Sequence, residues 1–494
     1  MIKNIKYKIL LIIIILSGSS CNKWLELKPQ DGIVREDFWK TKEQLQSAVV
    51  GCYSSLLSGA LVQNLFIWGE LRADMVSTTA FSTINEVDYK NAEILSTNSL
   101  TNWSLLYSTI NLCNTVIEYG PEVIKSDNTL TQQQLDAYLG EARALRAMMY
   151  FYLLRIWGEV PLQLKSSSSD SKIEQLAKST QTEVFNQIIS DLDFAALNAP
   201  TTYSSSNPGM DKGRITKYTV YALQADAYLW MDKYEECIAA CDKVINSNRF
   251  GLTDGSIASD WYSTLYERGN STESIFEVQF DAQALNPWFG VLAQPTRRFE
   301  SSIIVPDLFG YDLDPNKKDI RGDGGSYRIS DAVIWKHVGT STTNTVAENQ
   351  SYRHWFVYRY ADILLMKAEA CAWSNKGQEA LGLIDNIRAR AQALPATAES
   401  PDPTDATAVS DYILRERSRE FAFEGKRWYD LLRHAKRNNY AHLDLITDAI
   451  SMVAPPDKQQ SMISKFKDVR SHYLPIIITE LQADKKLVQN PFYN

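Results

Sequence analysis

The chain has 494 residues, a length that usually corresponds to two or more domains. Its net charge of −8 at pH 7 becomes −11 once the three lysines of an N-terminal leader are removed. This acidic balance argues against a surface for nucleic acid or for an anionic membrane, so no nucleic-acid partner is expected. After the leader, no segment reaches eighteen consecutive apolar residues, and no transmembrane helix is predicted.

Residues 1–20 have the pattern of a signal peptide. Three lysines precede an apolar run at 9–16, and the small residues Ser-Gly-Ser-Ser lead into Cys21. A small-residue run that ends in a single Cys resembles a bacterial lipoprotein cleavage site, although Leu16 stands further from the Cys than usual. We expect lipidation of Cys21 and a membrane anchor through its acyl chains. The alternative is ordinary secretory cleavage beside an unmodified Cys.

The other cysteines are odd in number and lie in apolar, helical contexts, without CxxC or Cys/His ligand spacing. We therefore predict small buried hydrophobic side chains rather than a disulfide framework or a metal site. These residues are Cys52, Cys113, Cys237, Cys241 and Cys371.

Helical periodicity dominates the rest of the chain. Apolar residues recur at helical spacing over 44–57, 103–119, 133–156, 180–197, 217–230 and 234–246. Gly and Pro after Tyr119, and Gly after Trp157, are expected to end two of these helices. No linker is long or biased enough to separate domains. We expect a leader at 1–20, then regions 21–250 and 251–494 packed as one compact unit.

A weak internal repeat suggests paired helices. Small and apolar residues from Ala225 to Val244 recur at the same spacing from Ala368 to Ile387. Small side chains let two antiparallel helices approach closely, as in tetratricopeptide units. The predicted fold is mainly α, with tetratricopeptide-like helix pairs.

The segment 250–355 breaks the helical pattern. Residues 274–280 alternate like a strand, and 332–337 are a second candidate strand. Gly, Pro, Asp and aromatic residues lie between them. We expect a loop-rich insertion with a few short strands, and such insertions are usually functional.

Charge is densest at 411–433, DYILRERSREFAFEGKRWYDLLR. Aromatic residues among so many charges indicate a partly buried ionic network rather than catalytic groups, with Glu and Arg pairing at helical spacing. A glycosidase would need two facing carboxylates, and no local motif marks such a pair. Asp312, Asp314, Asn316 and Asp323 imitate a calcium loop, but Lys317 occupies the position that needs Gly. No metal, cofactor or catalytic residue is predicted.

Several stretches, in order, resemble the SusD/RagB family of Bacteroidetes outer-membrane lipoproteins. They are CNKWLELKPQD, FWKTKEQLQSAVVGCYSSL, WSLLYSTINLCNTVIE, EARALRAMMYFYLLRIWGEVPL, YRYADILLMKAEACAW, ILRERSREFAFEGKRWYDLLRH and YLPIIITELQADKKLVQNPFYN. Within 250–355 only FGYDLDPNKKDIR is similar. The resemblance implies a cell-surface binding protein, not an enzyme. Such a protein covers a SusC-like TonB-dependent transporter and delivers a glycan, or in some branches a peptide, to it.

Sugars are recognised by flat aromatic faces beside planar polar groups. Family binding surfaces resemble this arrangement, with an exposed aromatic arc on loops. Trp288 is the leading candidate, because Asn-Pro before it and Gly soon after it predict a turn with an exposed indole. The other candidates on loops are Trp68, Arg72, Asp74, Trp261, Phe289, Arg297, Tyr327, Trp335, Tyr352 and Trp355.

The sequence is compatible with three functions. The first is a glycan-binding lipoprotein that serves a transporter, and the second is the same protein with a peptide or another nutrient as cargo. The third is a secreted glycoside hydrolase, which a single Glu or Asp substitution that abolishes turnover would establish.

Overall fold

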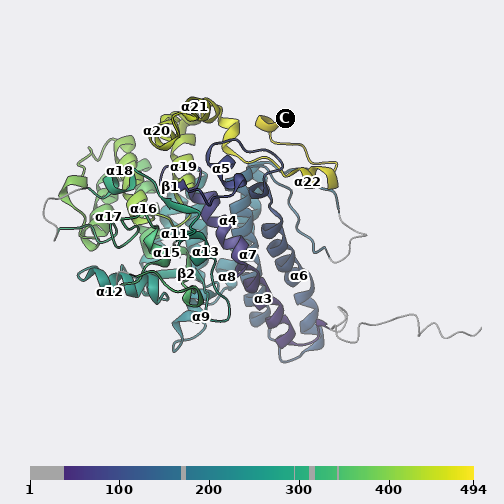
Figure 1. Cartoon of the computed structure of the whole chain (residues 1–494). Coiled ribbons are helices and arrows are strands. Elements are labelled where there is room, and N and C mark those ends of the chain that lie inside the picture. Colours follow the sequence, from purple (N-terminus) through teal and green to yellow (C-terminus); the bar gives the residue numbers. More distant parts are fainter. Residues whose placement is uncertain (1–37, 168–173, 294, 311–316, 342–343) are drawn as a thin grey trace, which may run out of the picture.

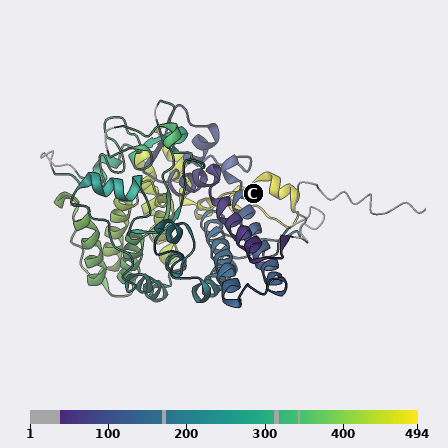
Figure 2. The ribbon, with the colours of Figure 1, turned by 90° about the horizontal axis from the view of Figure 1, so that it is seen from below.

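The computed structural model describes residues 38–167, 174–293, 295–310, 317–341 and 344–494. Helices make up most of it, with two small antiparallel sheets between them. In Figures 1 and 2 helices α3 and α6 stand on one side of the molecule and α16, α17 and α18 on the other. The predicted leader and Cys21 lie outside the described residues.

The N-terminal side is built from long helices: α3 (Lys42–Leu56), α4 (Gly59–Glu70), α5 (Ile84–Lys90), α6 (Ser104–Ser126), α7 (Gln132–Trp157), α8 (Gln181–Asn198) and α9 (Pro208–Gly213). Thr41, Thr131 and Thr180 cap α3, α7 and α8 through their side chains. Gly158 ends α7, as predicted. The predicted end of α6 is wrong, because Pro121 lies inside it. At this point Gly120 lies against the side chains of Leu45 and Leu139, and the helix continues past the proline to Ser126.

The predicted helix pairs are confirmed. α10 (Lys217–Trp230) pairs with α11 (Tyr234–Ile245), and α16 (Tyr360–Trp373) pairs with α17 (Gly377–Arg390). α11 also packs on α16, so the two repeat units stack although more than a hundred residues separate them in the chain. The repeated small residues sit in this interface, and Ala225, Cys241, Ala368 and Cys371 are all fully buried. All five described cysteines are buried, as predicted.

The C-terminal side continues with α18 (Ala406–Glu420), α19 (Arg427–Tyr440), α20 (Asp444–Val453), α21 (Gln459–Lys467) and α22 (Ile478–Ala483). Short 3-10 helices lie between many of these elements or at the chain end: η2 (Ser99–Thr101), η5 (Glu348–Gln350), η6 (Pro395–Thr397), η7 (Val469–His472) and η8 (Pro491–Tyr493). Among the described helices none is by itself long and apolar enough to span a membrane; α3 and α4 together would be, but they are bent by 51° where they meet.

The insertion contains α12 (Ala258–Tyr262), η4 (Ser263–Glu267), α13 (Trp288–Leu292), α14 (Val305–Leu308) and α15 (Trp335–Val338). β2 (Ser274–Val278) confirms the first predicted strand and pairs with β4 (Trp355–Arg359), which the sequence pattern missed. β1 (Val76–Thr78) pairs with β3 (Phe299–Ser301). The second predicted strand, 332–337, is wrong, since α15 occupies much of it. The His337 ring of this segment packs against Phe66 in the core, so the segment does not run along a sheet edge.

The predicted ionic network at 411–433 is confirmed. Arg359 is fully buried and contacts Glu273 just before β2, Glu420 at the end of α18 and Glu424 in the turn that follows α18. Burial alone would raise the pKa of Glu420, but Arg390, Arg359 and Arg321 together hold it well below the ordinary value. Most partners are therefore distant in sequence rather than one helical turn away, although the pair Glu416–Arg419 is local.

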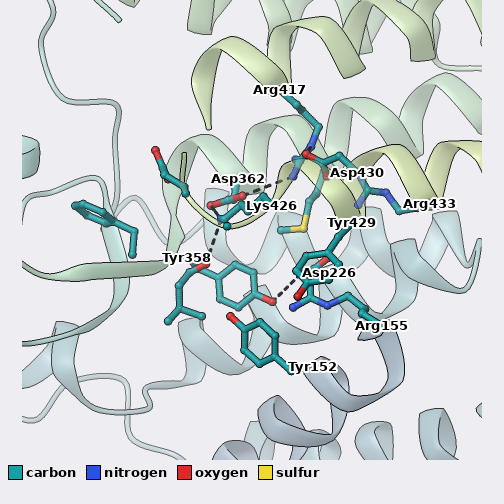
Figure 3. Close-up of a pocket in the computed structure, with 15 residues that line it drawn as sticks. Tyr152, Arg155, Asp226, Tyr358, Asp362, Arg417, Lys426, Tyr429, Asp430 and Arg433 are labelled. Atoms are coloured by element: carbon teal, nitrogen blue, oxygen red, sulfur yellow. Dashed lines mark hydrogen bonds and ion pairs between the residues drawn. The ribbon is translucent and has the colours of Figure 1, made fainter. Parts of the chain in front are cut away.

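A second part of the network surrounds a small internal cavity (Figure 3). Tyr358 and Arg155 both donate to Asp226, at 2.7 and 3.2 Å. Arg417 pairs with Asp430 at 2.9 Å. The cavity measures about 20 Å³, which is room for one water molecule and far too little for a sugar. The densest charge in the chain is thus part of the framework.

Candidate functional site

Most of the predicted aromatic candidates are buried. Trp288 has no exposed surface, so the expectation of an exposed indole is wrong. Its ring packs against His337, Trp355 and Phe66, with centroids 4.9, 5.3 and 5.6 Å away. The turn predicted around Trp288 exists as α13, but side chains from α4, α15 and β4 cover the indole. In this conformation Trp288 and Trp355 belong to the core of the insertion.

The candidates near α4 are also framework residues. Trp68 is buried and donates from its indole Nε1 to the carbonyl of Leu100 at 2.8 Å. Arg72 donates to two backbone carbonyls near residue 472, and its guanidinium lies 4.3 Å from the centroid of Trp428. Asp74 accepts two hydrogen bonds from Arg427, at 2.8 and 2.7 Å. Arg72 and Asp74 thus join the N-terminal helices to the C-terminal ones, whereas Trp68 makes its contact within the N-terminal part.

Trp261 and Tyr327 are buried as well. Trp261 packs edge-on against Tyr266 at 5.4 Å, and Tyr327 stacks on Phe309 at 5.9 Å. Burial raises the pKa of Tyr327 to about 12, so its hydroxyl is neutral at physiological pH. Neither ring presents a face to solvent.

Three candidates remain at the surface. Tyr352 is 40% exposed, and Phe289 and Arg297 are half-buried. Phe289 and Tyr352 belong to neighbouring segments, because Ser351 accepts from the Phe289 backbone N–H and donates to Asn286. Arg297 donates to Glu300 at 2.9 Å and to the carbonyl of Asp331 at 2.6 Å. Most of the candidates that the sequence places in the insertion are therefore core residues.

One open cleft lies inside the insertion, with a volume of about 400 Å³. We call it the insertion cleft. Its lining combines aromatic, hydroxyl, cationic and carboxylate side chains from α12, from the segment 318–328 and from α15 with the residues after it. They are Ala258, Ser259, Tyr262, Lys318, Asp319, Ile320, Asp323, Gly324, Arg328, Trp335, Thr340 and Ser341.

Trp335 lines the cleft, although only 2% of it is exposed. The guanidinium of Arg328 lies 4.4 Å from the Trp335 ring centroid, a cation–π contact. Two hydrogen bonds to Asp331, at 2.9 and 2.7 Å, fix the plane of that guanidinium. They also hold the pKa of the Asp331 carboxyl below its ordinary value, so the pair is charged at neutral pH. A planar cation is thus held beside an aromatic ring.

The remaining polar groups are also positioned by neighbours. Tyr262 donates to the carbonyl of Trp335 at 2.9 Å and accepts from Arg353 at 2.7 Å. Asp323 accepts from the backbone N–H of Ile329 at 2.9 Å and pairs with Lys318 at 3.4 Å. Contacts within the protein thus hold these polar groups in fixed positions around the cleft, as is usual in binding sites.

The surface beside the cleft is partly apolar. Arg297 reaches the Asp331 carbonyl, which connects the β1–β3 ribbon to the cleft. Phe81, Ile303 and Ile329 near this ribbon are 55%, 82% and 60% exposed. Sequence reasoning did not select Tyr262, Asp323, Arg328 or Lys318 as ligand contacts. The sequence pointed to two of them only indirectly: Tyr262 and Arg328 directly follow the candidates Trp261 and Tyr327.

Among the described residues, no group of three His, Cys, Asp or Glu side chains is arranged to hold a metal ion. Most of the calcium-like motif at 312–316 lies outside the described residues. Its last member, Asp323, makes the contacts given above.

Comparison with known proteins identifies the family. Residues 322–493 match the model described as SusD family, and residues 23–229 match the one described as "Starch-binding associating with outer membrane". The chain belongs to the SusD/RagB family. Members are nutrient-binding proteins associated with the outer membrane, and the predicted family resemblance is confirmed.

Similar proteins cover most of the chain. The SusD-like protein P38 of Formosa agariphila is 27% identical, over 88% of this chain and 92% of its own length. A SusD superfamily protein of Bacteroides vulgatus has a TM-score of 0.73 at 20% identity, covering 92% of this chain and all of its own. A structure described as a laminarin binding SusD-like protein has a TM-score of 0.71 at 23% identity, covering 92% of this chain and 99% of its own. The mainly α fold predicted from the sequence is that of this family.

Proposed function

We propose that this protein is a cell-surface lipoprotein that captures an oligosaccharide or polysaccharide and delivers it to a SusC-like TonB-dependent transporter. The observation that carries the proposal is the insertion cleft. It places Arg328 and Asp323 on one concave surface of about 400 Å³, above a floor that includes Tyr262 and Trp335, each of which is 2% exposed. A planar cation and a carboxylate on a concave surface with an aromatic floor can hydrogen-bond the hydroxyls of one or two sugar rings.

The charge of the cleft favours a neutral glycan over a strongly acidic one. Lys318 and Arg328 contribute two positive charges, and Asp319 and Asp323 contribute two negative ones. Such a balanced lining offers both donors and acceptors to sugar hydroxyls without attracting a polyanion. The laminarin-binding relative is consistent with a glycan cargo for this chain too.

The proposal does not include catalysis. Asp319 is held by both its oxygens on Arg321, and Asp323 pairs with Lys318. Glycoside hydrolysis needs one carboxyl that stays protonated and a second that faces the same sugar. The two carboxylates of the cleft are instead paired with cations, which suits binding without bond cleavage.

Binding would be tested by calorimetry and gel retardation with a panel of starch, laminarin, xylan, mannan, pectin and a mixed peptide digest. We expect at least one neutral glycan to bind. Arg328→Ala should weaken that binding about tenfold or more, because it removes a charged hydrogen-bond donor. Arg470→Ala is the matched control, since Arg470 also pairs with an Asp but at a site outside the cleft. A protein that binds the peptides and none of the glycans would overturn the glycan assignment.

The lipid anchor and the partner need their own tests. Cys21→Ala should move the protein from the membrane fraction to the soluble fraction of the cells that produce it. Protease added to intact cells should digest the wild-type protein if it faces outward. Co-purification from detergent extracts should recover a TonB-dependent transporter, and recovery of the protein alone under gentle extraction would contradict the partnership.

A further inference from the structure

A second open groove lies on the opposite side of the molecule from the insertion cleft. It has a volume of about 550 Å³, larger than the cleft, and lies between α6, the segments 161–167 and 174–176, and α22. Figures 1 and 2 both show α6 and α22 on the side away from α12. We call it the α6–α22 groove. It is lined by Trp103, Ser104, Tyr107, Ser108, Asn111, Pro161, Gln163, Ser167, Glu174, Gln175, Leu176, Glu480, Ala483, Asp484 and Leu487.

The groove has an aromatic base. The rings of Trp103 and Tyr107 stand edge to face with centroids 5.5 Å apart, and Tyr107 also contacts Tyr150. The Tyr107 hydroxyl donates to the carbonyl of Pro161 at 2.7 Å, which fixes the ring. Trp103 is almost fully buried, so Tyr107, half-buried, supplies the accessible part of the aromatic surface.

The walls of the groove are tied together by hydrogen bonds. Asn111 and Ser167 bond reciprocally, with the Asn111 amide donating at 3.1 Å and the Ser167 N–H donating at 2.7 Å. The backbone N–H of Leu176 donates to Asp484 on the segment after α22, at 2.8 Å. These hydrogen bonds connect α6, the segments 161–167 and 174–176, and the segment after α22 into one concave surface.

Polar side chains face this groove in a pattern unlike the insertion cleft. Ser104 and Ser108 offer hydroxyls, Gln163 and Gln175 offer amides, and Glu174, Glu480 and Asp484 offer carboxylates. Of the described residues that line it, none is Lys or Arg. The carboxylates of Glu174, Glu480 and Asp484 repel an anionic ligand and accept hydrogen bonds from hydroxyl or amino groups.

We propose that the α6–α22 groove is a second saccharide-binding site, selective for uncharged or amino sugars. The inference rests on the proposed function, because a second site gains affinity for the same extended glycan chain. A polysaccharide that touches both concave surfaces of one molecule, or of neighbouring molecules on the cell surface, is held by avidity. The volume lies within the range of about 300–1,000 Å³ that is usual for small-molecule sites.

The test uses the full mature protein and short oligosaccharides cut from each neutral panel glycan. Ser108→Trp fills the groove from an exposed helical position, and Ser47→Trp places the same ring on an exposed helical position of α3 outside the groove. Calorimetry should give two sites for the wild-type protein and for Ser47→Trp. It should give one site for Ser108→Trp and one for Arg328→Ala.

Other outcomes separate the two proposals. A single wild-type site that Arg328→Ala abolishes and Ser108→Trp leaves unchanged would overturn the groove and keep the proposed function. No binding by any protein in the panel would overturn both. A single site lost only in Ser108→Trp would support the groove and move the glycan site away from the cleft.

In the groove, an oligosaccharide of uronic acids should bind about tenfold more weakly than its neutral counterpart, because it meets like charges. Equal binding of the two in Arg328→Ala, where only the groove remains, would overturn the selectivity.

Discussion

Gly69 and Gly425 lie backbone against backbone, although 356 positions separate them in the chain. A Cβ on Gly69, near the end of α4, would overlap the carbonyl of Gly425. Gly425 has a φ of +73°, in the turn between α18 and α19, so its own lack of a side chain is also required. This contact joins the first helices of the protein to the most charged segment of the chain.

Gly69→Ala should therefore destabilise the protein strongly. Overpacking usually costs about 1–3 kcal/mol, and here the obstacle is the Gly425 backbone, which has no rotamer to change, so we expect the upper end. Urea unfolding followed by circular dichroism would measure the loss. Gly51→Ala is the control, because a Cβ there would meet nothing within 4 Å beyond its chain neighbours and the backbone of its own helix. That helical substitution should be neutral or stabilising. Equal effects at both positions would contradict the close packing.

Glu70 gives the same junction a pH dependence. Its Oε1 accepts from the backbone N–H groups of Gly425 and Lys426, at 2.8 and 3.1 Å, whereas its buried Oε2 has no hydrogen bond from the described residues. Burial raises the pKa of Glu70 from 4.5 to about 8. The folded protein therefore binds a proton that the unfolded chain releases above pH 4.5, and stability falls as the pH rises from 4.5 to 8.

Glu70→Gln should remove this loss, because a neutral amide keeps the acceptor oxygen. The free energy of unfolding of the variant relative to wild type should rise by at most about 1.4 kcal/mol for each pH unit across that window. Unfolding curves at pH 5 and pH 8.5 would measure the difference. A relative stability that is the same at both pH values would show that Glu70 is ionised in the folded protein.

The buried network predicts a large cost for removing a single charge. Glu420 is almost fully buried and contacts Arg321, Arg359 and Arg390. Glu420→Gln would leave these cations short of a counter-charge, and breaking a buried pair in this way costs about 3–5 kcal/mol. Thermal unfolding at neutral pH would measure the effect.

The matched control lies on the same helix. Arg415 pairs with Glu399 at 2.5 Å, but 49% of its side chain is exposed. Arg415→Met should cost no more than about 1 kcal/mol, as is usual for an exposed pair. Similar losses for Arg415→Met and Glu420→Gln would mean that burial does not set the strength of this network.

The end of α19 holds three consecutive residues in the left-handed region, Asn438, Asn439 and Tyr440. Such a conformation is strained for a residue with a side chain, and Asn tolerates it better than most. Asn439→Gly should stabilise the protein by about 0.5–1 kcal/mol, measured by the midpoint of thermal unfolding. Asn246→Gly, at a right-handed position with a φ of −69°, should instead be slightly destabilising. Destabilisation by both would place the strain elsewhere.

Local pattern predicted the helices well, because each one carries its own periodic apolar face and capping residues. The predicted helix 217–230 coincides with α10, and its neighbours agree within a few residues apart from α6. Pro121 shows the limit, since a local helix-ending signal does not include the contacts of Gly120 with Leu45 and Leu139. β4 was missed because its residues are buried on both faces and show no alternation.

The candidate site was predicted less well, for a physical reason. Sequence placed function in the insertion, and the cleft lies there. The choice of Trp288 failed because a turn motif reports the backbone and not what covers the side chain. Exposure depends on Phe66, His337 and Trp355, which come from elsewhere in the chain. Arg328 was not predicted, because its place in the cleft depends on its contacts with Trp335 and Asp331, and sequence spacing does not reveal such contacts.

The sequence by itself determined the helical body, the repeated helix pairs and the family, since these rest on periodicity and on motifs that are read locally. It also indicated that the dense charges at 411–433 form a framework, because aromatic residues accompany them. Only the tertiary structure decided which aromatic rings meet solvent and where a ligand finds open space. Those properties depend on contacts between distant segments, and burial is a property of the whole packed chain.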